Sequence, residues 1–211
     1  MLTFAHRGLH CMGYHQNSME AFRAAASKGY GIETDLRTTF DGVVVLFHDR
    51  CVDATPIDSI THEVLQAVLA REVPTLDQLL DADLGVPLNL DVKTGDAYGK
   101  SLATMLAARD QIALVSAFRH DIAIAAAAAG MPTAYLMASR PQFDVPLPPR
   151  RPNLETIVFD YDMIDEEIVE RVRMRNMSVV SYGAVTRREN ARLRDMGVVA
   201  SITDRPQDAP H

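Results

Sequence analysis

The sequence has few cysteines and no apolar run long enough to span a bilayer. The two cysteines, Cys11 and Cys51, are too few for a disulfide framework, so a reducing, cytoplasmic location is expected. Each closely follows a histidine, His6 or His48, so a Cys11–Cys51 bridge is the alternative to the two unpaired thiols that we expect. Met1 lies so near His6 that there is no room for a signal peptide ahead of that residue.

The chain also lacks a block of basic residues, and its formal net charge is −7. A surface of this charge does not attract nucleic acid or anionic lipid, so we expect no nucleic-acid partner and no stable membrane association. Two groups of arginines have acidic neighbours on predicted helices, and we interpret them as solvated helix faces. These are Arg171, Arg173 and Arg175, and Arg187, Arg188, Arg192 and Arg194.

The length and composition are those of a soluble globular protein. The 211 residues can bury a full core, and the hydrophobic fraction of 47% and charged fraction of 23% are ordinary. The sequence contains neither an internal repeat nor an interdomain linker. We therefore predict a single domain over residues 1–211, whose oligomeric state the sequence does not indicate.

Apolar, β-branched runs alternate with segments of helical period along the chain. The runs that predict strands are residues 2–5, 31–36, 88–92, 112–116, 133–136, 156–159, 178–182 and 199–202. The segments that predict helices are residues 18–28, 75–81, 100–109, 120–129, 165–175 and 187–195. A further strand-like run at 43–47 extends the second strand or forms a hairpin with it.

Eight strands separated mostly by helices predict parallel pairing, and this length fits a closed (β/α)₈ barrel, the TIM barrel. Residues 139–153 contain five prolines and cannot form a regular helix, so we predict an extended loop in place of one outer helix. The insertion that follows the second strand, about residues 50–73, is short.

The pair Glu33 and Asp35 indicates where the chemistry lies. Side chains of a strand alternate between its faces, so Ile32 and Leu36 point one way and both carboxylates point the other. Two neighbouring anions repel each other, which a protein tolerates when a cation lies between them or one carboxylate is protonated.

Other chemically active residues follow other predicted strands. His6-Arg7 follows the first, His48-Asp49 follows the strand-like run, and Asn89, Asp91 and Lys93 share one face of the third. The carboxyl ends of barrel strands meet at one mouth, so these side chains are expected to converge there. This inventory suits metal-assisted attack on a phosphate ester, and oxygen-only ligation favours Mg²⁺ or Ca²⁺ over zinc.

An ordered set of motifs covers nearly the whole chain and resembles the glycerophosphodiester phosphodiesterase family. The motifs are Ala5-His6-Arg7-Gly8, Asn17-Ser18-Met19-Glu20-Ala21-Phe22, Ile32-Glu33-Thr34-Asp35, Thr38-Thr39-Phe40-Asp41-Gly42-Val43-Val44-Val45, His48-Asp49, Pro74-Thr75-Leu76, Leu90-Asp91-Val92-Lys93 and Ile202-Thr203-Asp204-Arg205-Pro206.

This resemblance implies a (β/α)₈ barrel that uses a divalent cation, Mg²⁺ or Ca²⁺, to hydrolyse glycerophosphodiesters to an alcohol and glycerol 3-phosphate. The implied metal ligands are Glu33, Asp35 and Asp91, and the implied acid–base pair is His6 and His48. Two cationic residues, Arg7 and Lys93, would hold the phosphate. Tyr182 would stack against the substrate. We favour His6 as base or nucleophile and His48 as acid, although the sequence does not fix the direction.

Three departures from the family pattern leave other functions open. Asp91 stands where the family typically has glutamate, Tyr182 where it commonly has tryptophan, and the insertion that shapes a glycerol pocket is short. The segment 90–95 is also similar to that of sphingomyelinase D-type enzymes. A phospholipase D-like or sphingomyelinase D-like lyase, which acts on (lyso)phospholipids and gives a cyclic phosphate, is therefore one alternative. A non-catalytic barrel that binds a phosphate ligand is another.

Several of these candidate site residues have an alternative role. Arg7 and Lys93 are candidates for structural partners of the acidic cluster as well as for phosphate ligands. Asp49 either orients His48 or caps a turn. His10 and His15, in the first loop, are expected to be mostly exposed, and Tyr182 is either a stacking surface or a plain core residue.

Overall fold

The computed structural model describes residues 1–93, 112–142 and 146–209, and within these residues eight parallel strands close into a barrel. The predicted (β/α)₈ fold is thus confirmed. Closure occurs where β1 pairs with both β2 and β11. In barrel order the strands are β1 (Leu2–His6), β2 (Gly31–Thr38), β6 (Leu88–Val92), β7 (Ile112–Ala117), β8 (Thr133–Met137), β9 (Leu154–Asp160), β10 (Ser178–Tyr182) and β11 (Ala200–Thr203).

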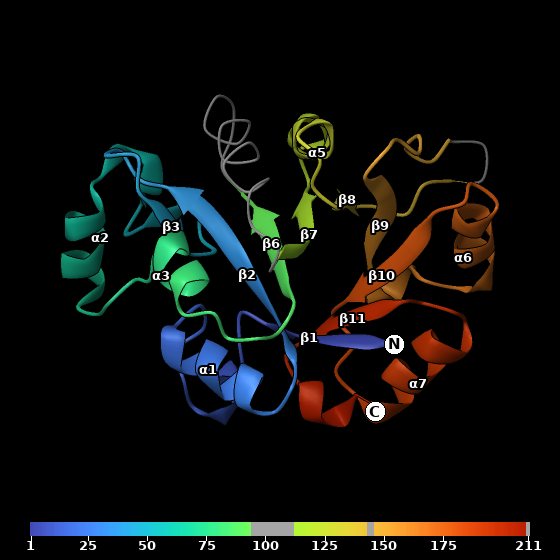
Figure 1. Ribbon diagram of the computed structural model, residues 1–211, viewed down its shortest axis with the longest axis horizontal. Helices are drawn as coiled ribbons and strands as arrows, with labels where there is room; N and C mark the ends of the chain where they lie inside the picture. Colours follow the sequence, from blue (N-terminus) through green and yellow to red (C-terminus); the bar gives the residue numbers. More distant parts are fainter. Residues whose placement is uncertain (94–111, 143–145, 210–211) are drawn as a thin grey trace.

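Helices surround these strands on the outside (Figure 1). The predicted ones that the structure describes are α1 (Met19–Ser27), α3 (Leu76–Asp81), α5 (His120–Ala128), α6 (Glu166–Arg173) and α7 (Arg187–Asp195). The predicted helix at 100–109 lies outside the described residues. Side chains of Ser18, Thr75, Asp165 and Thr186 accept hydrogen bonds from backbone amides in the first turn of α1, α3, α6 and α7. These caps satisfy amides that the helices themselves leave unpaired.

Strand alternation divides the hydrophobic residues between two cores. One set of side chains points outward and packs against the helices, for example Ala5, Ile32 and Leu90 with Phe22 of α1 and Leu79 of α3. The other set fills the barrel interior: Phe4, Ala134, Leu136, Val158, Val180, Ala200 and Ile202. Strands β2 and β6 direct the carboxylates Glu33, Asp35 and Asp91 into the barrel and not apolar side chains. The apolar part of the interior is therefore contributed by the other strands.

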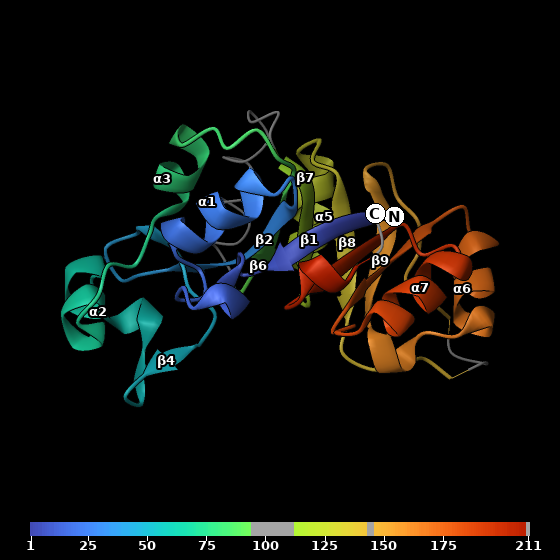
Figure 2. The same ribbon diagram turned by 90° about the horizontal axis from the view of Figure 1, so that it is seen from below.

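The segment after β2 forms a hairpin and a small helical unit. Strand β3 (Val44–Leu46) pairs antiparallel with β2, as one of the two predicted options had it. The strands β4 (Cys51–Val52) and β5 (Thr55–Pro56) and the helix α2 (His62–Leu69) follow. A separate apolar cluster holds this unit together: Val45, Phe47, Ile57, Leu65 and Val73. Figure 2 shows α2 and β4 at the opposite end of the molecule from α6 and α7.

The sequence analysis did not predict α2. Its N-cap is Thr61, whose hydroxyl accepts a hydrogen bond from the Val64 amide, and Leu65 is its one fully buried residue. Val64 and Val68 are 44% and 47% exposed. Helix α2 lies in the segment that the sequence analysis treated as a short insertion, so no helix was assigned there.

The proline-rich segment contains no helix in its described parts, 139–142 and 146–153, which agrees with the predicted loop. Neighbouring elements hold the loop through its carbonyl groups. Arg171 donates to the carbonyls of Pro141 and Gln142, and Arg175 donates to that of Leu147. The prediction of a solvated face is therefore wrong for Arg171, whose side chain is only 12% exposed.

The two cysteines are free thiols, and Cys11 is exposed. The expected absence of a Cys11–Cys51 bridge therefore agrees with the structure. Among the helices that the structure describes, none is both long and apolar enough to cross a membrane.

We predict that Thr186→Ala lowers the free energy of unfolding by about 1 kcal/mol, the usual effect of losing an N-cap. The Thr186 hydroxyl accepts from the Glu189 amide at 3.2 Å, and the Glu189 carboxylate accepts from the Thr186 amide at 2.9 Å. Urea unfolding followed by circular dichroism measures the change. Thr186→Ser, which keeps the hydroxyl, is the matched control and should retain wild-type stability. Equal stability of the alanine and wild-type proteins would show that the capping box contributes nothing.

Candidate active site

A cavity of about 180 Å³ brings together all the residues that the sequence analysis selected. They come from β2, from the ends of β1, β6 and β10 or the residues directly after them, and from the segment after β3. The selected residues that line the cavity are His6, Arg7, Glu33, Asp35, His48, Asp91, Lys93 and Tyr182. Two larger hollows, at the far end of β6 and between α6 and α7, are lined by no histidine. The mouth of the barrel is therefore the candidate active site.

The turn after β1 fixes the first residues of the site. Arg7 has a φ of +54° and Gly8 one of +79°, so the chain reverses sharply just after His6. A Cβ on Gly8 would lie 2.7 Å from that of Ala21, so only glycine lets this turn pack against α1. The Arg7 amide donates to Glu33 at 3.0 Å, which ties the turn to the acidic cluster.

The three carboxylates of the cluster lie on adjacent strands. Glu33 and Asp35 belong to β2 and Asp91 to β6, where Asp35 and Asp91 are register partners. One oxygen from each lies within 4.8 Å of the others, and all three residues are at least 94% buried. The side-chain amide of Asn17 donates to Asp35 at 3.0 Å and its carbonyl accepts from the Thr34 hydroxyl at 2.8 Å, which fixes the position of Asp35.

Two cationic side chains compensate this charge. Lys93 forms ion pairs with Asp91 and, at 3.2 Å, with Asp35, while the Arg7 Nε lies 3.0 Å from Asp35. The predicted partnership of Arg7 and Lys93 with the acidic cluster is thus present in the geometry. Burial alone would lower the pKa of Lys93, but Asp91 and Asp35 outweigh it and raise that pKa.

The three carboxyl groups experience different environments. Burial favours the protonated form of Asp35, but Lys93, Arg7 and the hydrogen bond from Asn17 outweigh it and lower its pKa. Burial and the nearby Asp35 raise the pKa of Glu33 to about 7. Burial likewise raises the pKa of Asp91, against the opposing effect of Lys93. If all three carboxyl groups were ionised, the cluster would carry one negative charge more than Lys93 and Arg7 neutralise, and Glu33 and Asp91 are the groups that burial drives towards protonation.

The cluster fits a hard divalent cation. Asp91 Oδ1 is fully buried and has no hydrogen-bond partner, a costly arrangement that a bound cation would relieve. The converging donors are carboxylate oxygens, which suit Mg²⁺ or Ca²⁺. A cation between them would also remove the repulsion that raises the pKa values of Glu33 and Asp91.

Each of the two predicted catalytic histidines is held by a carboxylate through the same ring nitrogen. His6 Nδ1 lies 2.7 Å from Asp204 and His48 Nδ1 lies 2.8 Å from Asp49. An ionised carboxylate only accepts hydrogen bonds, so each Nδ1 carries a proton and each neutral ring has its lone pair on Nε2. The Nε2 of His6 lies 3.9 Å from the Glu33 carboxylate.

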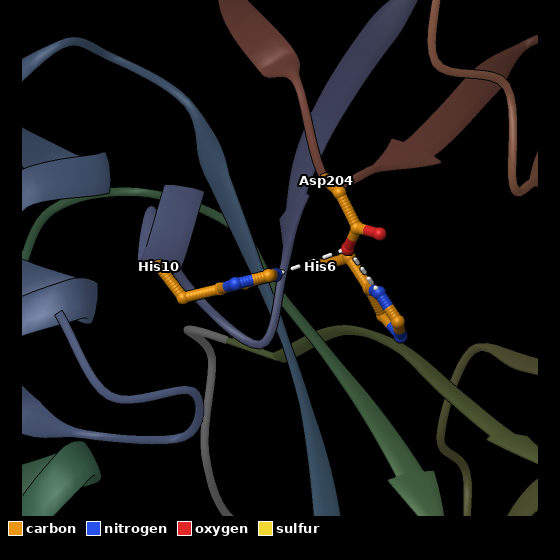
Figure 3. Close-up of side chains that lie close together, drawn as sticks. All are labelled: His6, His10 and Asp204. Atoms are coloured by element: carbon orange, nitrogen blue, oxygen red, sulfur yellow. Dashed lines mark hydrogen bonds and ion pairs between the residues drawn. The ribbon is translucent and has the colours of Figure 1, made fainter. Parts of the chain in front are cut away.

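Asp204 is the main residue that the sequence analysis did not single out. It follows β11 directly, and its Oδ1 lies 2.7 Å from His6 Nδ1 and 3.0 Å from His10 Nε2 (Figure 3). The hydrogen bond with His6 and the two imidazoles lower its pKa far below the usual value. The available signal was its place at the end of the last strand, where barrel residues face the mouth.

Other outcomes concern the loops around the cavity. His15 is exposed as expected, whereas His10 is partly buried and contacts Asp204, so the expectation that it is mostly exposed is wrong for His10. The alternative that Asp49 orients His48 agrees with their contact. Tyr182 lines the cavity and is partly exposed, which is not the position of a plain core residue.

Phe118 also lines the cavity and was not selected from the sequence. It lies just after β7 and is 43% exposed. The Lys93 Nζ is 5.3 Å from the centre of its ring, a cation–π contact that helps to hold the ammonium group at the mouth. A lone phenylalanine carries no chemical signal in a sequence, so only the structure reveals this contact.

Solved structures with the same fold cover almost the whole chain. A phosphodiesterase from Oleispira antarctica, in complex with the product sn-glycerol-3-phosphate, matches with a TM-score of 0.82 and 18% identity, over 98% of this chain and 94% of that one. A glycerophosphodiester phosphodiesterase from Parabacteroides distasonis matches with a TM-score of 0.79 and 22% identity, over 98% and 93%. At these identities the likeness concerns the fold alone.

A closer sequence match covers part of the chain. A probable glycerophosphodiester phosphodiesterase 2 from Mycobacterium tuberculosis is 37% identical over 105 residues, which are 46% of this chain and 40% of that protein. The family match is broader, because residues 6–208 fit the glycerophosphoryl diester phosphodiesterase family and so span the barrel from His6 to the residues that follow Asp204. The chain therefore belongs to the glycerophosphoryl diester phosphodiesterase family.

Proposed function

We propose that this protein is a metal-dependent phosphodiesterase that hydrolyses glycerophosphodiesters to an alcohol and glycerol 3-phosphate. The observation that supports this proposal most directly is the single cavity in which two imidazoles lie beside three buried carboxylates. Family membership supports the reaction class. The related Oleispira antarctica phosphodiesterase was solved with sn-glycerol-3-phosphate, the product that this reaction would release.

In this proposal Glu33, Asp35 and Asp91 hold Mg²⁺ or Ca²⁺. The bound cation would withdraw negative charge from the phosphate oxygens and so make the phosphorus easier to attack. Lys93 and Arg7 keep Asp35 ionised through their ion pairs, which preserves a full negative charge for the cation. Asp91 contributes Oδ1, the buried oxygen without a partner.

The two imidazoles act as the acid–base pair. The Nε2 lone pair of neutral His6 accepts a proton from the attacking hydroxyl or water, while Asp204 stabilises the charge that the ring gains. In the direction that we favour, His48 donates a proton from Nε2 to the leaving alkoxide, while Asp49 holds the ring through Nδ1. Both rings keep one orientation because their Nδ1 atoms are held by carboxylates.

The remaining polar residues bind and enclose the substrate. Arg7 and Lys93 supply positive charge beside the phosphate while they remain paired with the carboxylates. Tyr182 and Phe118 form aromatic walls of the cavity, against which the alcohol portion stacks.

We predict that glycerophosphodiesters are hydrolysed with Mg²⁺ or Ca²⁺ and that excess chelator abolishes turnover. The test is a panel of glycerophosphodiesters and lysophospholipids, with the products identified by phosphorus NMR. Glycerol 3-phosphate as the phosphorus-containing product supports the proposal. A stable cyclic phosphate would instead assign the protein to the sphingomyelinase D-like lyases. Thermal stabilisation by glycerol 3-phosphate, without turnover of any diester, would indicate a non-catalytic binding barrel.

We predict that His6→Ala and His48→Ala each lower kcat at least about 100-fold, because each removes one partner of the acid–base pair. The fold should persist, since both side chains lie at the cavity and outside the apolar cores. Steady-state kinetics and thermal unfolding measure the two effects separately. His15→Ala, an exposed histidine of the same first loop, is the control and should retain full activity. Full activity in either active-site variant would contradict the mechanism.

We predict that, in chelator, Glu33→Gln is more stable than wild type above pH 7 by up to about 3 kcal/mol, at about 1.4 kcal/mol per pKa unit. The pKa of Glu33 is raised from 4.5 in the unfolded chain to about 7 in the folded one. Folding therefore takes up a proton, and the stability of the wild type falls as the pH rises through this interval. Glutamine does not titrate and lacks this loss.

Urea unfolding at pH 4.5 and pH 8 measures this difference, which should be small at the lower pH. Saturating Mg²⁺ or Ca²⁺ should stabilise the wild type more than Glu33→Gln, because the variant lacks one anionic ligand. A glutamine variant that is less stable than wild type at pH 8 in chelator would show that Glu33 is not electrostatically strained.

A further inference from the structure

A second group of potential metal ligands lies beside the acidic cluster. His6 ends β1, His10 begins the short 3₁₀ helix η1 (His10–Met12), and Asp204 follows β11. Figure 3 shows both imidazoles directed at one carboxylate oxygen of Asp204, at 2.7 and 3.0 Å. The ligand atoms of all three residues lie within 4.8 Å of one another.

The donor set of this group differs from that of the acidic cluster. Two imidazole nitrogens and one carboxylate oxygen suit Zn²⁺ and similar transition metals, whereas three carboxylates suit Mg²⁺ or Ca²⁺. Each ion thus has a preferred site, although the two sites are adjacent.

We propose that His6, His10 and Asp204 form a second metal site, selective for Zn²⁺ and similar divalent transition ions, whose occupation inhibits the enzyme. Solvent reaches the three side chains, which are 29%, 28% and 47% exposed. The remaining coordination position is left to water, as in zinc sites with three protein ligands.

Ligand atoms around a tetrahedral zinc ion, at about 2.0 to 2.1 Å from the metal, are about 3.3 Å apart. The present separations from Asp204 are 2.7 and 3.0 Å, so each would open by a few tenths of an ångström. The two imidazole nitrogens lie within 4.8 Å of each other. His10 lies in the loop between β1 and α1, where η1 has no buried residue to resist this movement.

The surroundings of His6 also suit a metal ligand. Imidazoles that bind a metal through one nitrogen commonly direct the other N–H at a carboxylate. With a metal on Nδ1 of His6, Nε2 carries the proton and faces Glu33, whose oxygen is 3.9 Å away. The Glu33 carboxylate would have to move closer to accept this hydrogen bond.

Zinc binding would inhibit the enzyme because it changes which nitrogen of the His6 ring carries the proton. Without zinc, the Nδ1 proton of His6 is held by Asp204 and the Nε2 lone pair is available. With zinc on Nδ1, the proton moves to Nε2, and the ring no longer accepts a proton from the nucleophile. This consequence rests on the proposed role of His6 as base, whereas the binding of zinc does not.

Direct binding tests the site without reference to activity. Zn²⁺ is titrated against a chromophoric chelator in excess Mg²⁺, with wild type, His10→Gln and His15→Gln as matched proteins. We expect the His10 variant to bind at least about 10-fold more weakly and the His15 variant to bind as wild type does. All three keep the free thiols Cys11 and Cys51, so a difference at His10 does not come from cysteine. Equal affinity of wild type and His10→Gln would overturn the site.

Co²⁺ provides a second, spectroscopic measurement on the same proteins. A four-coordinate site in wild type and His15→Gln should give strong visible absorption bands, which His10→Gln should lose. Retention of the same bands in His10→Gln would place the ion elsewhere and overturn the proposal. Thermal unfolding verifies that the variants are folded, and His10→Ala serves as a second variant at this position.

Kinetics test the inhibitory effect. At saturating Mg²⁺, micromolar Zn²⁺ should inhibit wild type, while His10→Gln should keep its basal rate and require at least about 10-fold more Zn²⁺ for the same inhibition. Zinc binding that depends on His10 but leaves turnover unchanged would overturn the inhibition. A protein without diesterase activity would refute the proposed function, and the binding and Co²⁺ measurements would still decide the site.

Discussion

The site depends on keeping three carboxylates together in a place that excludes water. Glu33, Asp35 and Asp91 repel one another most strongly where the dielectric constant is low, so the fold must supply compensation. Lys93 and Arg7 provide part of it through their ion pairs with Asp35 and Asp91. In the proposed function a divalent cation would provide the rest, so the electrostatic cost at the barrel mouth would be what favours metal binding.

The two imidazoles complete this arrangement because they are fixed independently of the acidic cluster. Asp204 reaches His6 from the last strand, and Asp49 reaches His48 from the adjoining position in the same loop. Both carboxylates remain partly solvated, whereas Glu33, Asp35 and Asp91 are buried. The residues proposed to exchange protons are thus reached by water, and the residues proposed to hold the cation are shielded from it.

The sequence predicted most of the barrel from its alternating strands and helices, and many of the cavity residues from strand alternation, their places after predicted strands and the family motifs. A period of two places Glu33 and Asp35 on one face whatever the rest of the fold does. Helix α2 was missed because it lies in the segment that was treated as an insertion, and the role of His10 was missed because it depends on a contact with Asp204, 194 residues away. Such a contact arises from barrel closure, and no local pattern encodes it.

Closure of the barrel also determines when His6 acquires its carboxylate partner. Strand β1 pairs with β11, and the orientation of His6 depends on a residue 198 positions later in the chain. Contacts between residues so far apart in the sequence are slow to form during folding. The His6 side chain therefore gains its carboxylate partner only once the last strand has joined the barrel.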